Sequence, residues 1–90
     1  LMRSISLQVT YRRGRPSAAY IWLGQRAGTK SARSVEWSPD LVVDFAADGR
    51  PIGVEVVDPE SVTTGQIFAV FDGLGLARPD AADLAPLAAA

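Results

Sequence analysis

Residues 41–57 read LVVDFAADGRPIGVEVV and contain the strongest local structural signal in the chain. Asp48 and Gly49 stand between two runs rich in β-branched residues, and an Asp-Gly pair supplies the positive backbone φ angles of a two-residue type I′ turn. The stretch therefore predicts a β-hairpin whose register is fixed by its turn. One predicted face is continuously apolar, with Ala47 opposite Arg50, Phe45 opposite Ile52, Val43 opposite Val54 and Leu41 opposite Val56. The other face carries one carboxylate on each arm, Asp44 and Glu55.

The sequence before this hairpin predicts a second one. Residues 4–11 alternate strictly between polar and apolar side chains, which is typical of a half-buried strand. Gly14 and Pro16 interrupt the alternation, and residues 18–23 (AAYIWL) resume it. The predicted apolar face holds Ile5, Leu7, Val9 and Tyr11 in the first strand and Ala19, Ile21 and Leu23 in the second, while Tyr20 and Trp22 face the other way.

A third strand is predicted near residues 32–37. It follows residues 24–30, whose two glycines and low hydrophobicity predict a mobile, disordered loop. If residues 38–40 form a three-residue turn, Glu36 lies near Val42 and Glu55, while Val35 and Trp37 join the apolar face opposite Val43 and Leu41. If residues 38–39 alone form the turn, Arg33 lies opposite Asp44 and neutralises it. Hydrophobic matching favours the first register, with Ser34 opposite Asp44, which leaves an acidic surface of Glu36, Asp44 and Glu55.

The periodicity changes after Asp58-Pro59. Ile67, Val70, Phe71 and Leu74 recur at helical spacing, which predicts an amphipathic helix with Thr63 or Thr64 as N-cap and Gly73 or Gly75 near its end. The predicted fold is therefore α+β: an antiparallel β-meander of about five strands with a C-terminal amphipathic helix packed on one face.

Residues 77–90 are expected to form a tail. Asp80 is positioned to cap a short second helix, but Pro86 limits that helix, and Leu84 and Leu87 offer it little apolar surface. We therefore expect one domain over residues 1–76 and a strap over residues 77–90 that packs on the body or on a partner.

Composition excludes several classes of function. The 90 residues include no Cys and no His, which removes disulfides, thiolate chemistry and the usual proton shuttle near neutral pH. A net charge of −1 gives no general attraction to nucleic acid, and we expect no cofactor and no metal site. No apolar run approaches the roughly 18 residues of a membrane helix, and residues 1–10 alternate where a signal peptide would be continuously apolar. We expect a cytoplasmic protein.

The order of these motifs resembles a known bacterial family, the domain of unknown function 2283. The resemblance covers about residues 5–58 and is most specific for Tyr20-Ile21 and for Asp44, Asp48, Gly49, Arg50, Gly53 and Glu55 at matching spacing. Arg12, Ser17 and Ala19 depart from the family pattern in the first hairpin. The resemblance implies a small sheet with a helix and no established activity. It also implies an association with small basic toxin-like proteins, as their partners or antitoxins.

Asp44 and Glu55 admit three interpretations. As diagonal neighbours with backbones roughly 7 to 8 Å apart, they could act as an acid and base pair or as metal ligands, for instance in a small hydrolase or metal-dependent enzyme built around a dimer groove. The absence of an evident pocket within one subunit argues against both kinds of chemistry. They could equally be the solvated side of the sheet.

The third interpretation is binding. Tyr20 and Trp22 share this side of the sheet with Glu36, Asp44 and Glu55, and aromatic side chains beside carboxylates suit an arginine-rich protein surface. We therefore predict a binding protein, antitoxin-like in its recognition of a basic partner through this face, with homodimerisation through the same face as its competitor. No catalytic residue is predicted.

Two further motifs favour structural interpretations. Arg12, Arg13 and Arg15 could contact phosphate, but no stacking aromatic stands within the turn, so a solvated turn is preferred and nucleic acid is an unlikely ligand. Gly73 and Gly75 resemble a nucleotide-binding loop superficially, yet they end a helix rather than open one.

Overall fold

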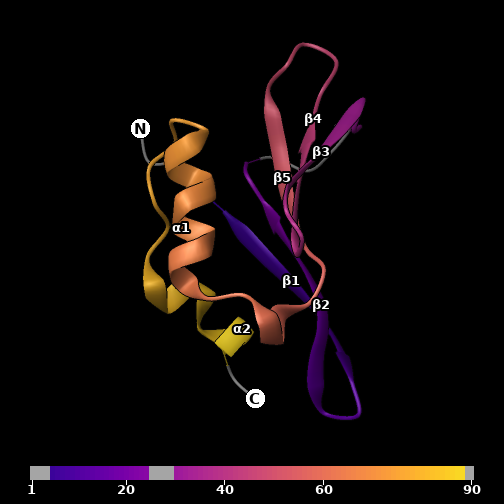
Figure 1. Cartoon of the computed structure of the whole chain (residues 1–90), viewed down its shortest axis with the longest axis vertical. Helices are drawn as coiled ribbons and strands as arrows, with labels where there is room; N and C mark the ends of the chain where they lie inside the picture. The colour runs from indigo at the N-terminus through magenta and orange to yellow at the C-terminus, as the bar shows by residue number, and fades with distance from the viewer. Residues whose placement is uncertain (1–4, 25–29, 89–90) are drawn as a thin grey trace.

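The computed structural model describes residues 5–24 and 30–88 and shows a five-stranded sheet with helices on one side (Figure 1). The strands are β1 (Ser6–Arg12), β2 (Arg15–Trp22), β3 (Arg33–Ser38), β4 (Leu41–Phe45) and β5 (Pro51–Val56). They are followed by the 3-10 turn Pro59–Ser61, α1 (Thr64–Gly73), the 3-10 turn Ala81–Leu84 and α2 (Ala85–Ala88). The predicted α+β class and antiparallel five-stranded sheet are confirmed. Within the described ranges, no helix has the length and apolar character needed to cross a membrane.

The strands are ordered β1-β2-β5-β4-β3, and each neighbouring pair is antiparallel. This order differs from a sequential meander, because β5 returns beside β2 and β3 moves to the far edge. The physical reason is burial: β4 and β5 carry fully buried residues, whereas most of β3 is exposed and suits an edge. The segment between β2 and β3 includes residues 25–29, where a disordered loop was predicted, and these lie outside the described residues.

The turn predicted at Asp48-Gly49 is one residue longer than expected. Ala46 accepts a hydrogen bond from the Gly49 amide (2.9 Å) and donates one to the Arg50 carbonyl (2.8 Å), so Ala46 rather than Ala47 lies opposite Arg50. Gly49 has a φ of +89°, whereas Asp48 has no positive φ, so the prediction of a type I′ turn is wrong. The loop has three residues, with Gly49 in the bulge position that commonly follows a type I turn. Asp48 Oδ1 also accepts from the Arg50 amide (3.0 Å).

A bulge in β5 restores the predicted register toward the middle of the hairpin. Phe45 lies opposite Pro51 rather than Ile52, and Ile52 is the additional residue. Beyond it, Asp44 faces Gly53, Val43 faces Val54 and Leu41 faces Val56. The error at the turn and the bulge therefore cancel, and the inner pairs are as predicted.

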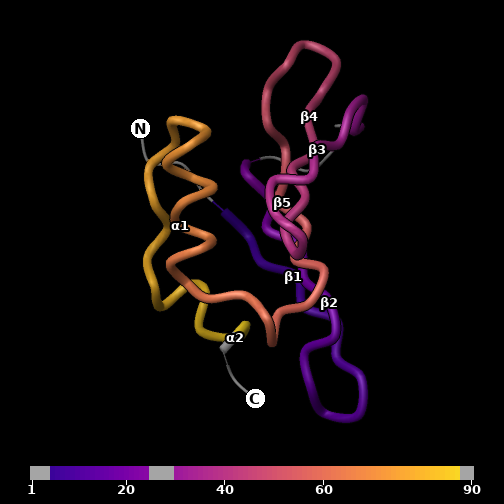
Figure 2. The backbone as a smooth tube through the Cα atoms, viewed as in Figure 1, coloured from indigo at the N-terminus to yellow at the C-terminus, as the bar shows by residue number. Residues whose placement is uncertain are grey.

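A two-residue turn with positive φ at both positions does occur, but in the first hairpin. Arg13 has a φ of +56° and Gly14 a φ of +77°, the combination that a type I′ turn requires. The register then shifts by one residue at Ser17, whose hydroxyl donates to the Thr10 carbonyl (3.1 Å). Tyr11, predicted to lie on the apolar face, pairs with Pro16 near the tip and is 52% exposed. The tips of the two hairpins lie at opposite ends of the long axis (Figure 2).

β3 pairs with β4 in the register that hydrophobic matching favoured. Val35 lies opposite Val43, and Ser34 rather than Arg33 lies opposite Asp44. Arg33 instead lies opposite Phe45, with its guanidinium carbon 4.5 Å from the centre of that ring. The alternative in which Arg33 neutralises Asp44 is wrong.

Trp37 departs from its predicted position opposite Leu41. A bulge between Glu36 and Ser38 lets Ser38 pair with Leu41 instead. The Trp37 ring packs against the end of α1, where a Cβ on Gly73 would come within 2.6 Å of Trp37 Cζ2. A larger residue at position 73 would therefore displace the Trp37 ring.

Local hydrogen bonds set both ends of α1. Thr63 and Gln66 form a reciprocal capping box: Thr63 Oγ1 accepts from the Gln66 amide (3.1 Å), and Gln66 Oε1 accepts from the Thr63 amide (2.7 Å). At the other end Gly75 adopts a φ of +73°, and the Leu76 amide donates to the Phe71 carbonyl (2.9 Å), which completes a Schellman motif. Of the alternative caps predicted, Thr63 and Gly75 are the ones used.

The hydrophobic core lies between the sheet and the helices. Leu84 and Leu87, from the segment after α1, are 2% and 8% exposed, so the expectation that they bury little is wrong. Both leucines contribute to the same core as the strands. The core comprises Ala19, Ile21, Leu23, Leu41, Val43, Val54, Val56, Ile67, Val70, Phe71, Leu84 and Leu87.

Candidate functional site: the open face of the sheet

Two rows of paired side chains cross all five strands on the sheet face opposite α1. Strand pairing places the residues of each row directly opposite one another, so neighbours within a row are in lateral contact range. The first row holds Gln8, Tyr20, Glu55, Val42 and Glu36, and the second holds Ser6, Trp22, Gly53, Asp44 and Ser34. All five predicted site residues lie in these rows. We call Tyr20, Trp22, Glu36, Asp44 and Glu55 the acidic-aromatic face.

Tyr20 crosses over β5 to reach β4. Its ring lies over Gly53, because a Cβ built on Gly53 would overlap the ring carbons and the hydroxyl. Gly53 therefore marks a close approach, as an isolated glycine within a strand often does. The Tyr20 hydroxyl extends beyond Gly53 and donates a hydrogen bond of 2.7 Å to Asp44 Oδ2.

Asp44 is held from both sides. Tyr20 donates to its Oδ2, and the Ser34 hydroxyl donates to its Oδ1 at 2.6 Å. Burial raises the pKa of Tyr20 well above its usual range, and the hydrogen bond to Asp44 and the negative charges of Asp44 and Glu55 raise it further. Tyr20 therefore stays protonated and remains a donor, and Asp44 serves as the centre of a local hydrogen-bond network.

Trp22 extends the aromatic surface beside Tyr20. The two ring centroids are 4.5 Å apart with an interplanar angle of 58°, a tilted arrangement that aromatic pairs favour. The Trp22 indole Nε1 is 3.4 Å from Gln8 Oε1, to which it donates. Both aromatic side chains are half-buried although none of the helices that the structure describes covers this face, because the two rings pack on each other and on the sheet.

Glu36 and Glu55 differ from Asp44 in their surroundings. Both are exposed, and Val42 separates them in the first row. Within the described part of the chain, neither glutamate carboxylate has an ion-pair or hydrogen-bond partner. With two strand spacings of about 4.8 Å between their backbones, their mutual repulsion in water is about 0.4 kcal/mol. They are the carboxylates on this face that remain available to a ligand.

The arrangement gives little support to catalysis by Asp44 and Glu55. The two residues lie in different rows, and both oxygens of Asp44 already accept hydrogen bonds from the protein. Across residues 5–24 and 30–88, no group of three or more acidic side chains is arranged to hold a metal ion. A paired-carboxylate mechanism needs both groups available to the substrate, one as acid and one as base, and Asp44 is already engaged by Tyr20 and Ser34.

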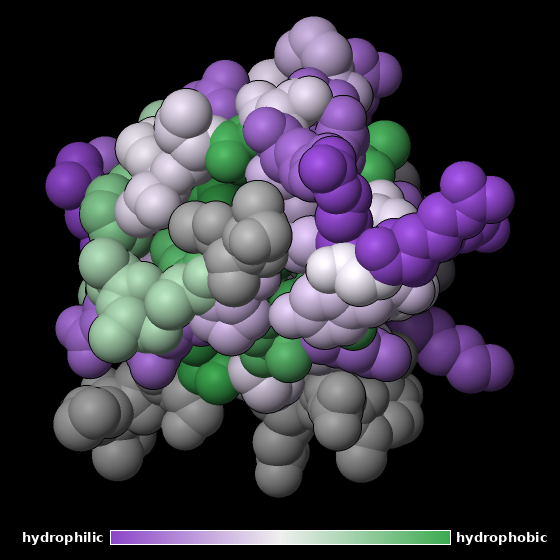
Figure 3. Space-filling view, turned by 90° about the horizontal axis from the view of Figure 1, so that it is seen from below, coloured by the Kyte–Doolittle hydropathy of each residue, from purple (hydrophilic) through white to green (hydrophobic). Residues whose placement is uncertain are grey.

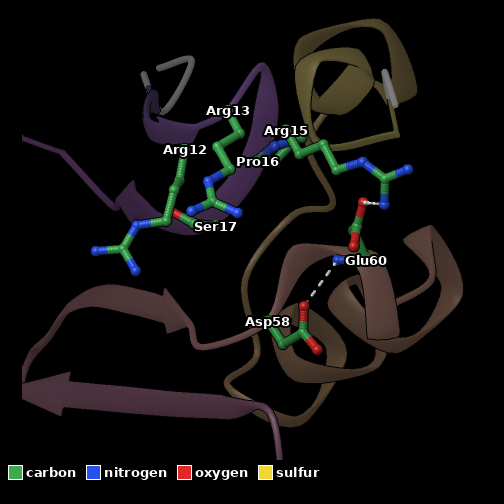
Figure 4. Close-up of a pocket in the computed structure, with 7 residues that line it drawn as sticks. All are labelled: Arg12, Arg13, Arg15, Pro16, Ser17, Asp58 and Glu60. Carbon is green, nitrogen blue, oxygen red and sulfur yellow. Dashed lines mark hydrogen bonds and ion pairs between the residues drawn. The ribbon is translucent and has the colours of Figure 1, made fainter.

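A depression lies at the tip of the β1–β2 hairpin (Figure 4). Sequence reasoning found its arginines but missed its acids, Asp58 and Glu60, because more than 40 residues separate them from the turn. Arg15 Nη1 is 3.5 Å from Glu60 Oε2, and Asp58 accepts from the Glu60 amide (3.3 Å). The depression is lined by Arg12, Arg13, Arg15, Pro16, Ser17, Asp58 and Glu60.

The fold and site define a small α+β protein with one sheet face covered by helices and the other open. Residues 18–58 match the model of a family described as a protein of unknown function, DUF2283. The match over that segment confirms the resemblance drawn from the sequence. The matched segment spans β2 to β5 and contains every residue of the acidic-aromatic face. No curated protein and no solved structure matched the chain.

Proposed function

We propose that this protein is a binding module that docks a basic protein partner on its acidic-aromatic face. The observation that carries the proposal is the pair of exposed glutamates, Glu36 and Glu55, whose carboxylates have no partner among residues 5–24 and 30–88, beside the half-buried rings of Tyr20 and Trp22. A guanidinium group can stack on an aromatic ring while it donates hydrogen bonds to a neighbouring carboxylate. The face offers both partners side by side.

The rigidity of the face supports binding further. Tyr20 is fixed by its hydrogen bond to Asp44 and by the close approach to Gly53, and Trp22 packs on Tyr20. A partner therefore meets aromatic side chains that have already lost their rotamer freedom, which lowers the entropic cost of association. Val42 adds an apolar contact between the two glutamates.

Inhibition of a small basic toxin-like protein is the specific form of binding that the family resemblance implies. An antitoxin of this kind would cover a cationic surface of its target with the acidic-aromatic face. Binding is preferred to hydrolysis because Asp44 is engaged by Tyr20 and Ser34.

The test is a titration of isotopically labelled protein with short peptides, followed by NMR. An arginine-rich peptide should shift amide signals of β2, β3, β4 and β5, whereas a glutamate-rich peptide of equal length should shift none. The variant Glu36→Gln with Glu55→Gln should bind the arginine peptide at least about tenfold more weakly, because it loses both free charges. A matched control, Asp80→Asn with Asp83→Asn, removes the same charge from exposed residues after α1 and should bind as the wild type does.

Two results would contradict the proposal. One is unchanged affinity of the Glu36→Gln, Glu55→Gln variant for the arginine peptide. The other is a pattern of shifted signals that maps to the helices rather than to the open face.

A further inference from the structure

We propose that the basic partner of the acidic-aromatic face is a second copy of this chain, which contributes the arginines of its β1–β2 hairpin. The inference rests on the proposed function, because it assigns an occupant to the same face. Its starting point is that the molecule carries both halves of a complementary pair of surfaces, one acidic and one basic, on the same sheet.

The hairpin tip carries positive charge that the rest of the molecule does not neutralise. Arg15 pairs with Glu60, and both oxygens of Asp58 already accept from Glu60 and Ser61. Arg12 and Arg13 have no ion-pair partner within the described residues, and Figure 4 shows their guanidinium groups apart from the Arg15–Glu60 pair.

The tip is also accessible to another molecule. It lies at one end of the long axis, away from α1 (Figure 1). Viewed from that end, long hydrophilic side chains project on the sheet side, while paler, more hydrophobic surface covers the helical side (Figure 3). Arg12, Arg13 and Arg15 are all exposed.

Strand register orders three kinds of surface along the sheet. Arg12 pairs with Arg15 at the tip, and Tyr20 pairs with Glu55 in the first of the two rows on the open face, which we call the acidic row. Between these lie Ala18 and Val57, the residues next to the Ala19–Val56 pair. Because side chains alternate along a strand, Ala18 and Val57 lie on the same side of the sheet as Tyr20 and Glu55. Val57 is 44% exposed, a large apolar side chain at the surface. The order is therefore basic, apolar, acidic.

This order is self-complementary about a two-fold axis. In a two-fold interface the same patch meets itself in reverse, so the ends of the patch must be complementary and its centre must match itself. An axis through the row of Ala18 and Val57 brings the basic tip of each copy to the acidic row of the other. It also brings the two copies of Val57 together. The five residue-to-residue steps from Arg15 to Tyr20 span about 16 Å, so the two charged ends lie at similar distances from that axis.

The expected association is weak and depends on salt. Exposed ion pairs each contribute little and are screened, and a patch of a few side chains falls below the size of a stable permanent interface. We expect a dissociation constant of roughly 10 μM to 1 mM at low salt, with a further weakening of at least about tenfold at 0.5 M NaCl.

The test is charge reversal with complementation, measured by sedimentation across this concentration range. The variants Arg12→Glu with Arg13→Glu, and Glu36→Lys with Glu55→Lys, should each remain monomeric, because like charges then meet across the interface. An equimolar mixture of the two should form a heterodimer. One of its two charged contacts joins the unchanged hairpin tip to the unchanged face, and the other is restored with reversed sign.

A matched mixture controls for net charge alone. Lys30→Glu with Arg50→Glu, and Asp80→Lys with Asp83→Lys, make the same four-unit changes of net charge at exposed residues away from the two charged surfaces. Each of these variants should dimerise about as the wild type does at moderate salt. Circular dichroism of every variant verifies its fold.

The outcomes separate this inference from the proposed function. A wild-type chain that stays monomeric at 1 mM, yet binds the arginine peptide on the acidic-aromatic face, overturns the second-copy inference and leaves the proposed function standing. A dimer that persists with both arginines reversed, or an open-ended series of larger oligomers, also overturns it. A chain that neither dimerises nor binds the peptide contradicts both.

Discussion

Gly53→Ala should destabilise this protein, although alanine is ordinarily the better residue within a strand. The new methyl group would occupy the space of the Tyr20 ring, which crosses Gly53 to reach Asp44. Tyr20 would have to rotate away and give up its 2.7 Å hydrogen bond to Asp44. The substitution therefore tests whether the ring is held against the sheet as described.

The expected magnitude follows from two opposing effects. Replacing glycine by alanine in a strand gains about 0.5–1 kcal/mol of backbone entropy. Losing a hydrogen bond to a charged acceptor costs about 1.5–3 kcal/mol, and displacing the ring from Trp22 adds about 0.5–1.5 kcal/mol. The net loss is about 2 kcal/mol, which for a domain of this size lowers Tm by about 10 °C.

Thermal and urea unfolding of four proteins would measure the effect: wild type, Gly53→Ala, Tyr20→Ala and the double variant. With Tyr20 removed, the three atoms nearest to the new methyl group are gone, so Gly53→Ala should then stabilise by about 0.5 kcal/mol. The reversal of sign is the decisive observation. An equal loss of stability in both backgrounds, or a gain in the wild type, would refute the proposed contact.

Three further predictions concern pH, the helix cap and the segment after α1. The pKa of Tyr20 is higher in the folded chain than the value of about 10 in an unfolded chain. The contribution of this shift to stability is therefore complete below pH 10 and is lost as pH rises further. Urea unfolding should show a steeper loss of stability at alkaline pH for the wild type than for Tyr20→Phe. Thr63→Ala removes the hydroxyl that accepts from the Gln66 amide and should lower stability by about 1 kcal/mol in thermal unfolding, whereas Thr64→Ala should change it by less than about 0.5 kcal/mol. Leu84→Ala should lower the free energy of unfolding by about 2–4 kcal/mol in urea, because Leu84 is 2% exposed in the core. A loss below about 1 kcal/mol would mean that the segment after α1 does not support the fold.

Local chemistry made the ends of α1 and the inner register of β4 and β5 predictable. A capping Thr63, a glycine at the position after the helix and the alternation of β-branched residues each act over a few residues, so the sequence displays them directly. The Asp48-Gly49 turn was less predictable, because an Asp-Gly pair also suits a three-residue loop in which the glycine alone takes a positive φ.

The strand order and the contacts of Tyr20 depend on distant parts of the chain. The sequence between residues 24 and 32 does not indicate whether β2 pairs with β3 or with β5. Burial of the central strands determines this pairing. Once β5 lies beside β2, Tyr20 faces Glu55 and its ring lies over Gly53. The isolated glycine at residue 53, between Ile52 and Val54 in a predicted strand, was the sequence signal that could have indicated this close approach.

The structure also changes which carboxylates carry the electrostatics of the open face. Asp44 and Glu55 look equivalent in the sequence, one on each arm of a hairpin, but Asp44 has two donors and Glu55 has none among the described residues. Neutralising Asp44 would therefore disturb Tyr20 and Ser34, and a loss of binding in such a variant would not distinguish a damaged surface from a lost contact. The carboxylates of Glu36 and Glu55 are exposed and have no partner among the described residues, so their neutralisation changes the charge of the face with little effect on the fold. The informative pair for any test of binding is for this reason Glu36 with Glu55.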